Sequence, residues 1–144
     1  MGLVEDALTH FENDGYNCSQ SILSTYGAQF GLDQDLALKM ASGFGGGMGR
    51  LGNTCGAVTG SIMVLGLKYR NRNANDIESK EKTYELVKTF IEEFITKNGS
   101  IICRELIGSD LISIEGREKA KTNLCPNFVR SAGEILEKFL ENVK

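Results

Sequence analysis

The chain has no tryptophan, one proline and one histidine among its 144 residues. A single proline leaves most of the chain free to form uninterrupted helices, because proline breaks the helix interior. The lone histidine, His10, has no second imidazole with which to share a metal ion. No histidine accompanies any cysteine, so a papain-like thiol nucleophile would lack its base. We therefore expect His10 to be a structural or exposed side chain.

An excess of positive charge is also missing, with 16 Lys and Arg against 19 Asp and Glu and a net charge of −3. This balance gives no support to a nucleic-acid-binding role. The longest apolar run, Ile62–Leu67, is far below the ~18 residues that a membrane span requires. No basic segment followed by an apolar one opens the chain, so no signal peptide is predicted. We expect a cytoplasmic protein that does not insert into membranes.

Alternation of apolar and polar residues, the mark of a half-buried strand, is absent as well, and the hydrophobic periodicity is helical nearly throughout. It predicts a first helix over residues 3–13, a second whose apolar face is marked by residues 22–30, a third at 34–40, and further helices over residues 54–69, 77–98, 103–107, 115–122 and 126–140. The helix at 34–40 is expected to turn Leu36, Ala37 and Met40 inward, behind an Asp33 cap. The helix at 54–69 is apolar on most sides, which predicts burial at the centre of the fold. We expect an all-α multi-helix bundle forming one domain over residues 1–144.

A glycine-rich stretch, residues 43–52, precedes that central helix. Its Gly47–Gly52 segment matches G-x-G-x-x-G, but a helix and not a strand comes before it, which argues against a dinucleotide site. Two interpretations remain. The glycines could let backbone N–H groups crowd a charged centre, with Arg50 adding positive charge. Alternatively they form a connector and allow close helix packing, since Gly52, Gly56 and Gly60 recur every four residues.

Four cysteines are what the chain does have. Each can be placed at the start of a predicted helix: they are Cys18 after Asn17, Cys55 after Asn53 and Thr54, Cys103 three residues after Ser100, and Cys125 before Pro126. Asn, Ser and Thr are N-cap residues, and Pro favours the first helical position. A helix N-terminus favours an anion, so a thiol held there ionises more readily. The chain is therefore predicted to form thiolates.

The spacing of the cysteines excludes a C-x-x-C motif and leaves three interpretations open. Two cysteines could cycle between dithiol and disulfide. All four could bind a [2Fe–2S] cluster or a structural zinc ion, for which four thiolates are suitable ligands. In the third, the protein is an interaction domain with incidental buried cysteines.

Several segments together resemble a known family. They are Asn17–Ser21, the glycine-rich Gly45–Arg50 leading into Thr54–Gly60 with its C-G-A-x-x-G core, and the later Cys103 and Cys125. This pattern resembles the C_GCAxxG_C_C family of proteins described as redox-active. The resemblance covers nearly the whole chain, assigns the family's four cysteines to the four of this chain and its core glycines to Gly56 and Gly60, and implies redox activity.

We predict a thiol-redox site in which Cys55 is the attacking thiolate, with a pKa below that of a free thiol. Thr54 or Asn53 would cap the helix beside it, and Cys18 would be the resolving partner. Cys103 and Cys125 would form a second pair. The residues predicted to line the site and hold any cofactor are Gly45, Gly46, Gly47, Arg50, Thr54 and Gly56. The expected partner is a redox protein or a small thiol or disulfide.

The charged residues Glu118 and Lys121 are predicted to be solvated helix surface.

Overall fold

The computed structural model describes residues 2–108 and 113–141, and the secondary structure of this part is helical. Its helices are α1 (Gly2–Asn13), α2 (Cys18–Gly27), α3 (Gln34–Ala41), α4 (Gly56–Tyr69), α5 (Ile77–Asn98), α6 (Cys103–Ile107), α7 (Ile114–Asn123) and α8 (Cys125–Glu141), with short 3₁₀ turns at Ala28–Phe30 and Ser42–Phe44. The described residues contain no strand, and one isolated antiparallel bridge joins Thr54 to Ile102. The prediction of an all-α bundle is confirmed.

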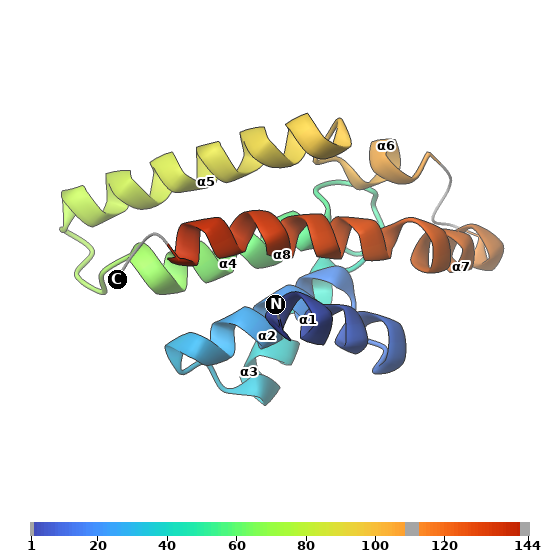
Figure 1. Ribbon diagram of the computed structural model, residues 1–144, viewed down its shortest axis with the longest axis horizontal. Helices are drawn as coiled ribbons and strands as arrows, with labels where there is room; N and C mark the ends of the chain where they lie inside the picture. The colour runs from blue at the N-terminus through green and yellow to red at the C-terminus, as the bar shows by residue number, and fades with distance from the viewer. Residues whose placement is uncertain (1, 109–112, 142–144) are drawn as a thin grey trace.

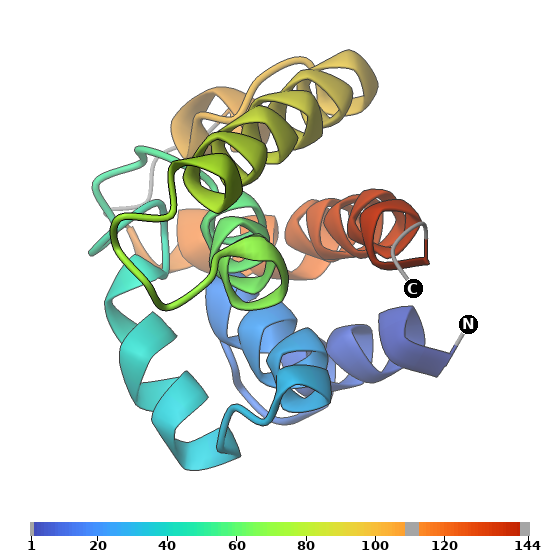
Figure 2. The ribbon, with the colours of Figure 1, turned by 90° about the vertical axis from the view of Figure 1, so that its left-hand side faces the viewer.

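The helices lie in three tiers, which Figures 1 and 2 show from two directions. The middle tier consists of α4 and α8. The long α5 covers it on one side, and α1, α2 and α3 cover it on the other. Helices α2, α4 and α8 begin at the same end of the bundle, the right-hand end of Figure 1, where α5 finishes and α6 follows. This arrangement brings several helix N-termini together at one place.

Helix α4 packs against α2, α5 and α8, as its apolar sequence predicts. Its contact with α2 depends on two glycines. A Cβ atom on Gly60 would lie 2.9 Å from the carbonyl oxygen of Ser19, and one on Gly56 would lie 2.9 Å from the Ser19 backbone nitrogen. The two backbones can approach this closely only because neither glycine has a side chain. The interpretation of Gly56 and Gly60 as packing residues is therefore correct.

The core between the tiers is made of large apolar side chains from helices distant in sequence. Its largest fully buried members include Tyr26, Phe90, Phe94, Leu65 and Leu136. The Tyr26 hydroxyl donates a hydrogen bond to Glu137 of α8 (2.7 Å), so this buried polar group is satisfied. Because α1 and α2 both pack on α8, the first and last thirds of the chain share one core.

The prediction for α3 is partly wrong. Asp33 does cap the helix, accepting a hydrogen bond from the backbone N–H of Leu36, and Ala37 is buried. Leu36 and Met40, however, are each 49% exposed. The helix is short and lies at the edge of the bundle, so its apolar face is covered only along the line of Ala37 and Ala41.

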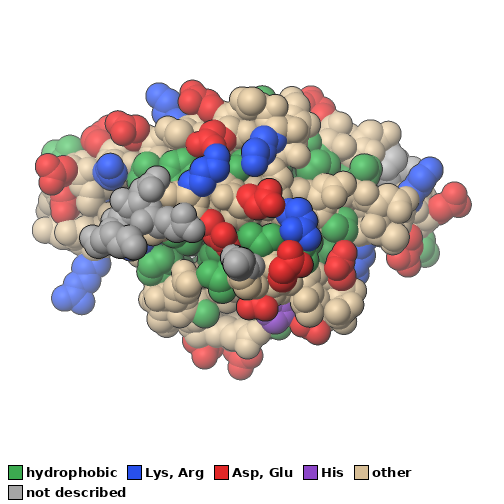
Figure 3. All heavy atoms as spheres, viewed as in Figure 1, with side chains coloured by type: hydrophobic (Ala, Val, Ile, Leu, Met, Phe, Trp, Pro, Cys, Tyr) green, Lys and Arg blue, Asp and Glu red, His purple; other side chains and the backbone are tan. Residues whose placement is uncertain are grey.

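None of the helices in the described part of the chain has the length and apolarity needed to cross a membrane. On the face shown in Figure 3, acidic and basic side chains are interspersed around apolar patches.

Candidate thiol site

All four cysteines stand where helices begin. Cys18, Cys103 and Cys125 are the first residues of α2, α6 and α8, and Cys55 is the N-cap residue of α4. The start of α2 is the best defined, because Asn17 and Gln20 form a reciprocal capping box. The prediction that each cysteine stands at a helix start is confirmed, but Asn17 is the predicted N-cap that the structure bears out, whereas Cys55 and Ile102 occupy the N-cap positions of α4 and α6.

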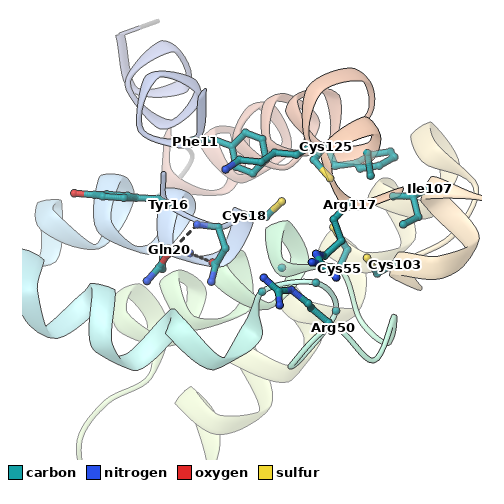
Figure 4. A pocket seen from close by; sticks show the side chains of 18 of the residues that line it. Phe11, Tyr16, Cys18, Gln20, Arg50, Cys55, Cys103, Ile107, Arg117 and Cys125 are labelled. Carbon is teal, nitrogen blue, oxygen red and sulfur yellow. Dashed lines mark hydrogen bonds between the residues drawn. The ribbon is translucent and has the colours of Figure 1, made fainter. Parts of the chain in front are cut away.

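The same four residues line one cavity of about 710 Å³ at the end of the bundle where these helices start. Figure 4 shows their side chains entering it from different walls, with Cys18 on α2 and Cys125 on α8. Cys55 and Cys103 are buried, with exposed fractions of 3% and 9%. Cys18 and Cys125 are only partly buried. The fold thus gathers four free thiols in one place, two of them more accessible than the others.

The thiol groups of Cys18 and Cys125 are close enough to act on each other's ionisation. This interaction is the largest cause of the raised pKa of Cys18 and of the lowered pKa of Cys125, since it favours a thiol at one sulfur and a thiolate at the other. The ammonium of Lys121 lowers the pKa of Cys125 further. Cys125 is therefore the cysteine best placed to be a thiolate.

Cys55 is not. Burial raises the pKa of Cys55 to about 12, so the prediction of a lowered value is wrong. The expected effect of the helix start is present, because the backbone N–H groups of Ala57 and Val58 lower the pKa, but desolvation outweighs it. Burial likewise raises the pKa of Cys103 to about 11, and its proximity to Cys125 adds to the shift.

Cys55 and Cys103 are fixed by the short bridge between Thr54 and Ile102. The backbone N–H of Cys55 donates to Ile101 (2.7 Å), and that of Cys103 donates to Asn53. Thr54 is therefore engaged in the bridge, and neither it nor Asn53 caps α4, contrary to the prediction. The bridge ties the end of the glycine-rich stretch to the segment between α5 and α6, which holds both buried thiols in place.

The glycine-rich stretch forms a tight loop beside the cysteines. Five consecutive residues, Gly46 to Arg50, have φ between 60° and 68°, and Met48 and Arg50 hold this left-handed conformation despite having side chains. Such a conformation costs roughly 1–2 kcal/mol per non-glycine residue. Since no strand precedes the loop in the structure, it is no dinucleotide-binding turn.

The predicted lining residues of this region divide into two groups. The cavity lining includes Gly45, Gly46, Gly47, Arg50 and Gly56, whereas Thr54 lies outside it. Gly47 is the most constrained, because a Cβ there would lie 2.6 Å from the Asn53 nitrogen and 2.7 Å from the Cys103 Cβ. Gly56 serves mainly to let the start of α4 approach Cys18 of α2.

Sequence reasoning missed the charged groups contributed by α7. Arg117, Glu118 and Lys121 line the cavity, although Glu118 and Lys121 were predicted to be plain surface. The relevant pattern is the spacing of four residues between Lys121 and Cys125. It places the ammonium near the sulfur because α8 starts almost directly where α7 ends.

The geometry gives little support to a bound metal. In residues 2–108 and 113–141, no three His, Cys, Asp or Glu side chains are arranged to hold a metal ion. A structural zinc site or a [2Fe–2S] cluster held by four thiolates requires all four sulfurs to converge at bonding distance. The donor atoms have suitable chemistry, but the arrangement of the described side chains fits neither group.

Comparison with known proteins places the chain in a family. It is similar to an uncharacterized protein of Archaeoglobus fulgidus, 30% identical over 141 residues, which covers 92% of this chain and 89% of that one. No solved structure matches this chain. The sequence profile of the family described as "Putative redox-active protein (C_GCAxxG_C_C)" matches residues 16–139. The chain that carries this four-cysteine site therefore belongs to the C_GCAxxG_C_C family.

Proposed function

We propose that the protein is a thiol–disulfide redox protein whose working pair is Cys18 and Cys125, with Cys125 as the attacking thiolate. The observation that carries the proposal is that these two partly exposed thiols line the same cavity at the starts of α2 and α8, where each acts on the ionisation of the other. The pairing differs from the one predicted from sequence, in which Cys55 attacked and Cys18 resolved.

The lowered pKa of Cys125 supports its assignment as the nucleophile, because the thiolate is the reactive form of cysteine. Cys18 is then the resolving thiol. It lines the same cavity and is close enough to Cys125 to shift its pKa, so it is placed to attack a mixed disulfide formed on Cys125. The electron partner is a redox protein or a small thiol or disulfide.

The two buried cysteines have a different place in this proposal. Cys55 and Cys103 have raised pKa values, so they remain protonated at neutral pH and react slowly. We assign them to the inner wall of the site, where they pack against the working pair.

The test is a redox titration of the anaerobic, reduced protein in buffers of 2-mercaptoethanol and its neutral disulfide. Free thiols are alkylated at each point and the peptides are mapped by mass spectrometry. We expect one reversible disulfide, Cys18–Cys125, while Cys55 and Cys103 stay alkylatable. Cys125→Ser should abolish it, whereas Cys55→Ser should retain it.

Other outcomes identify the alternatives. A disulfide between Cys18 and Cys55 would favour the pairing predicted from sequence. Failure to form any reversible disulfide, with all four thiols slow to alkylate, would contradict the proposal and favour an interaction domain. Iron or zinc bound in stoichiometric amount to anaerobically purified protein would favour a metal site.

A further inference from the structure

The charge of the cavity is opposite to that of the protein. The chain as a whole carries a net charge of −3. Among residues 2–108 and 113–141, the charged side chains that line the cavity are Arg50, Arg117 and Lys121, which are cationic, and Glu118, which is a carboxylate. Positive charge gathered in a cleft raises the local concentration of anions and speeds their entry.

The cations come from two walls that are unrelated in sequence. Arg50 stands on the glycine-rich loop, and Arg117 and Lys121 stand on α7. Figure 4 shows the side chains of Arg50 and Arg117 extending into the same cavity from these two sides. Lys121 is close enough to Cys125 to act on its sulfur electrostatically. The positive charge therefore surrounds the place where the proposed nucleophile would meet a substrate.

Arg50 is the cation least explained by the fold. Within residues 2–108 and 113–141 its guanidinium makes no hydrogen bond and no ion pair, and its backbone is held left-handed at φ 64°. Its neighbours Gly46 and Gly47 also line the cavity, and in that part of the chain neither backbone N–H donates to a backbone acceptor. A strained loop that presents an unpaired guanidinium and free N–H groups to a cavity is suited to receive an anion.

We propose that the substrate of this cavity is a low-molecular-weight disulfide that carries anionic groups near its sulfur atoms. The inference rests on the proposed function and adds the class of oxidant. The cavity of about 710 Å³ is in the range of small-molecule sites, roughly 300–1,000 Å³. The partly buried sulfurs inside it are more accessible to a small molecule than to a disulfide on a folded protein. Phe11, Tyr16 and Phe128 supply an apolar part of the lining for the remainder of the molecule.

The reaction proceeds in two exchanges. The Cys125 thiolate attacks one sulfur of the substrate, which forms a mixed disulfide and breaks the substrate's S–S bond, releasing one small thiolate. The Cys18 thiol then gives up its proton, which the released thiolate accepts, and its sulfur attacks Cys125. The second small thiolate leaves. The substrate has gained two electrons and leaves as one thiol and one thiolate, and the protein has lost two electrons as the Cys18–Cys125 disulfide.

The experiment compares three acyclic disulfides of similar size that differ in charge: anionic 3,3′-dithiodipropionate, neutral 2-hydroxyethyl disulfide and cationic cystamine. The rate at which each oxidises the reduced full-length protein is measured by acid quench and mass spectrometry. We expect the anionic disulfide to react about tenfold faster than the neutral one at low salt, as steering into a cleft of opposite charge allows. We expect the cationic one to be slowest, and the differences to shrink at high salt.

Two arginine variants assign the preference to the cavity. Arg50→Ala should reduce the ratio of anionic to neutral rates, whereas Arg72→Ala, the same charge change in the exposed segment between α4 and α5, should leave that ratio unchanged. Equal rates for all three disulfides, or equal effects of the two variants, would overturn the inference. The proposed function would stand in that case, because it depends only on formation of the Cys18–Cys125 disulfide in the neutral buffer.

Discussion

The contact between α2 and α4 can be tested with two glycines of the same helix. A Cβ on Gly60 would lie 2.9 Å from the Ser19 carbonyl oxygen and 3.0 Å from the Ile22 Cβ, closer than atoms normally approach. A Cβ on Gly66, six residues later in α4, would meet nothing within 4 Å. Gly60→Ala and Gly66→Ala thus make the same chemical change in a crowded and in an open place.

The expected magnitudes follow from these distances. Alanine is favoured over glycine inside a helix by about 1 kcal/mol, and this gain applies to both variants. At Gly60 the new methyl also overpacks the α2 backbone, which costs about 1–3 kcal/mol. Gly66→Ala should therefore raise the free energy of unfolding by up to about 1 kcal/mol, and Gly60→Ala should leave the protein about 1–3 kcal/mol less stable than Gly66→Ala.

Urea unfolding followed by circular dichroism measures this difference, which corresponds to roughly 2–10 °C in Tm. Because the comparison is between two variants of one helix, the helix-propensity gain largely cancels. Gly60→Ala should also slow formation of the Cys18–Cys125 disulfide, since α2 carries Cys18 one residue before the point of contact at Ser19. If the two variants were equally stable, the close approach of α2 to α4 would be refuted.

Three further predictions concern the thiols. Lys121→Gln should raise the pKa of Cys125, because it removes a nearby positive charge. Alkylation of Cys125 near pH 7 should slow, and its pH profile should move to higher pH. An unchanged profile would contradict the assigned role of Lys121. Gly47→Ala should alter the alkylation rate of Cys103, because the new methyl would crowd the Cys103 Cβ. Gly49→Ala introduces the same left-handed strain but meets nothing within 4 Å, so it should affect stability alone. Equal effects of the two variants on the alkylation of Cys103 would assign the loop to folding only. The reduced protein should lose stability as the pH rises from about 8.5 towards 11–12, because the three thiols other than Cys125 hold their protons in the folded state and release them on unfolding. Each thiol should lower the free energy of unfolding by up to about 1.4 kcal/mol per pH unit. Chemical denaturation measures this change, and a constant stability across the range would contradict the reasoning.

The helix starts were predictable because capping is a local property. Asn17 and Asp33 each accept a hydrogen bond from a backbone N–H three residues later, which a short stretch of sequence is enough to predict. The position of Cys18 at a helix start followed from the same reasoning, whereas α4 and α6 begin at Cys55 and Cys103 without a side-chain cap. The burial of α4 was also visible, since its apolar residues leave no polar face.

What depends on contacts between distant segments was not predictable. Nothing near Cys18 indicates that Cys125 lines the same cavity, because this requires α2 and α8 to begin at the same end of the bundle. The burial of Cys55 has the same origin, and burial rather than the local helix start decides its pKa. The bridge that engages Thr54 depends on Ile102, which lies beyond the whole of α5. The left-handed φ of Met48 could not be predicted either, because residues with side chains rarely adopt it.

The proximity of Cys18 to Cys125 has a consequence for the free energy of folding. These residues lie near opposite ends of the chain, and a bond between them would close a loop of about 100 residues, for which chain entropy gives a stabilisation of roughly 4–5 kcal/mol. Folding and disulfide formation are linked in one thermodynamic cycle. If the disulfide stabilises the fold, then folding must favour formation of the disulfide from the dithiol by the same free energy. The packing of α1 and α2 on α8 thus sets the effective concentration of the Cys18 thiol at Cys125. A substitution in that packing, far from any sulfur atom, would change the reduction potential of the pair as well as the stability of the fold.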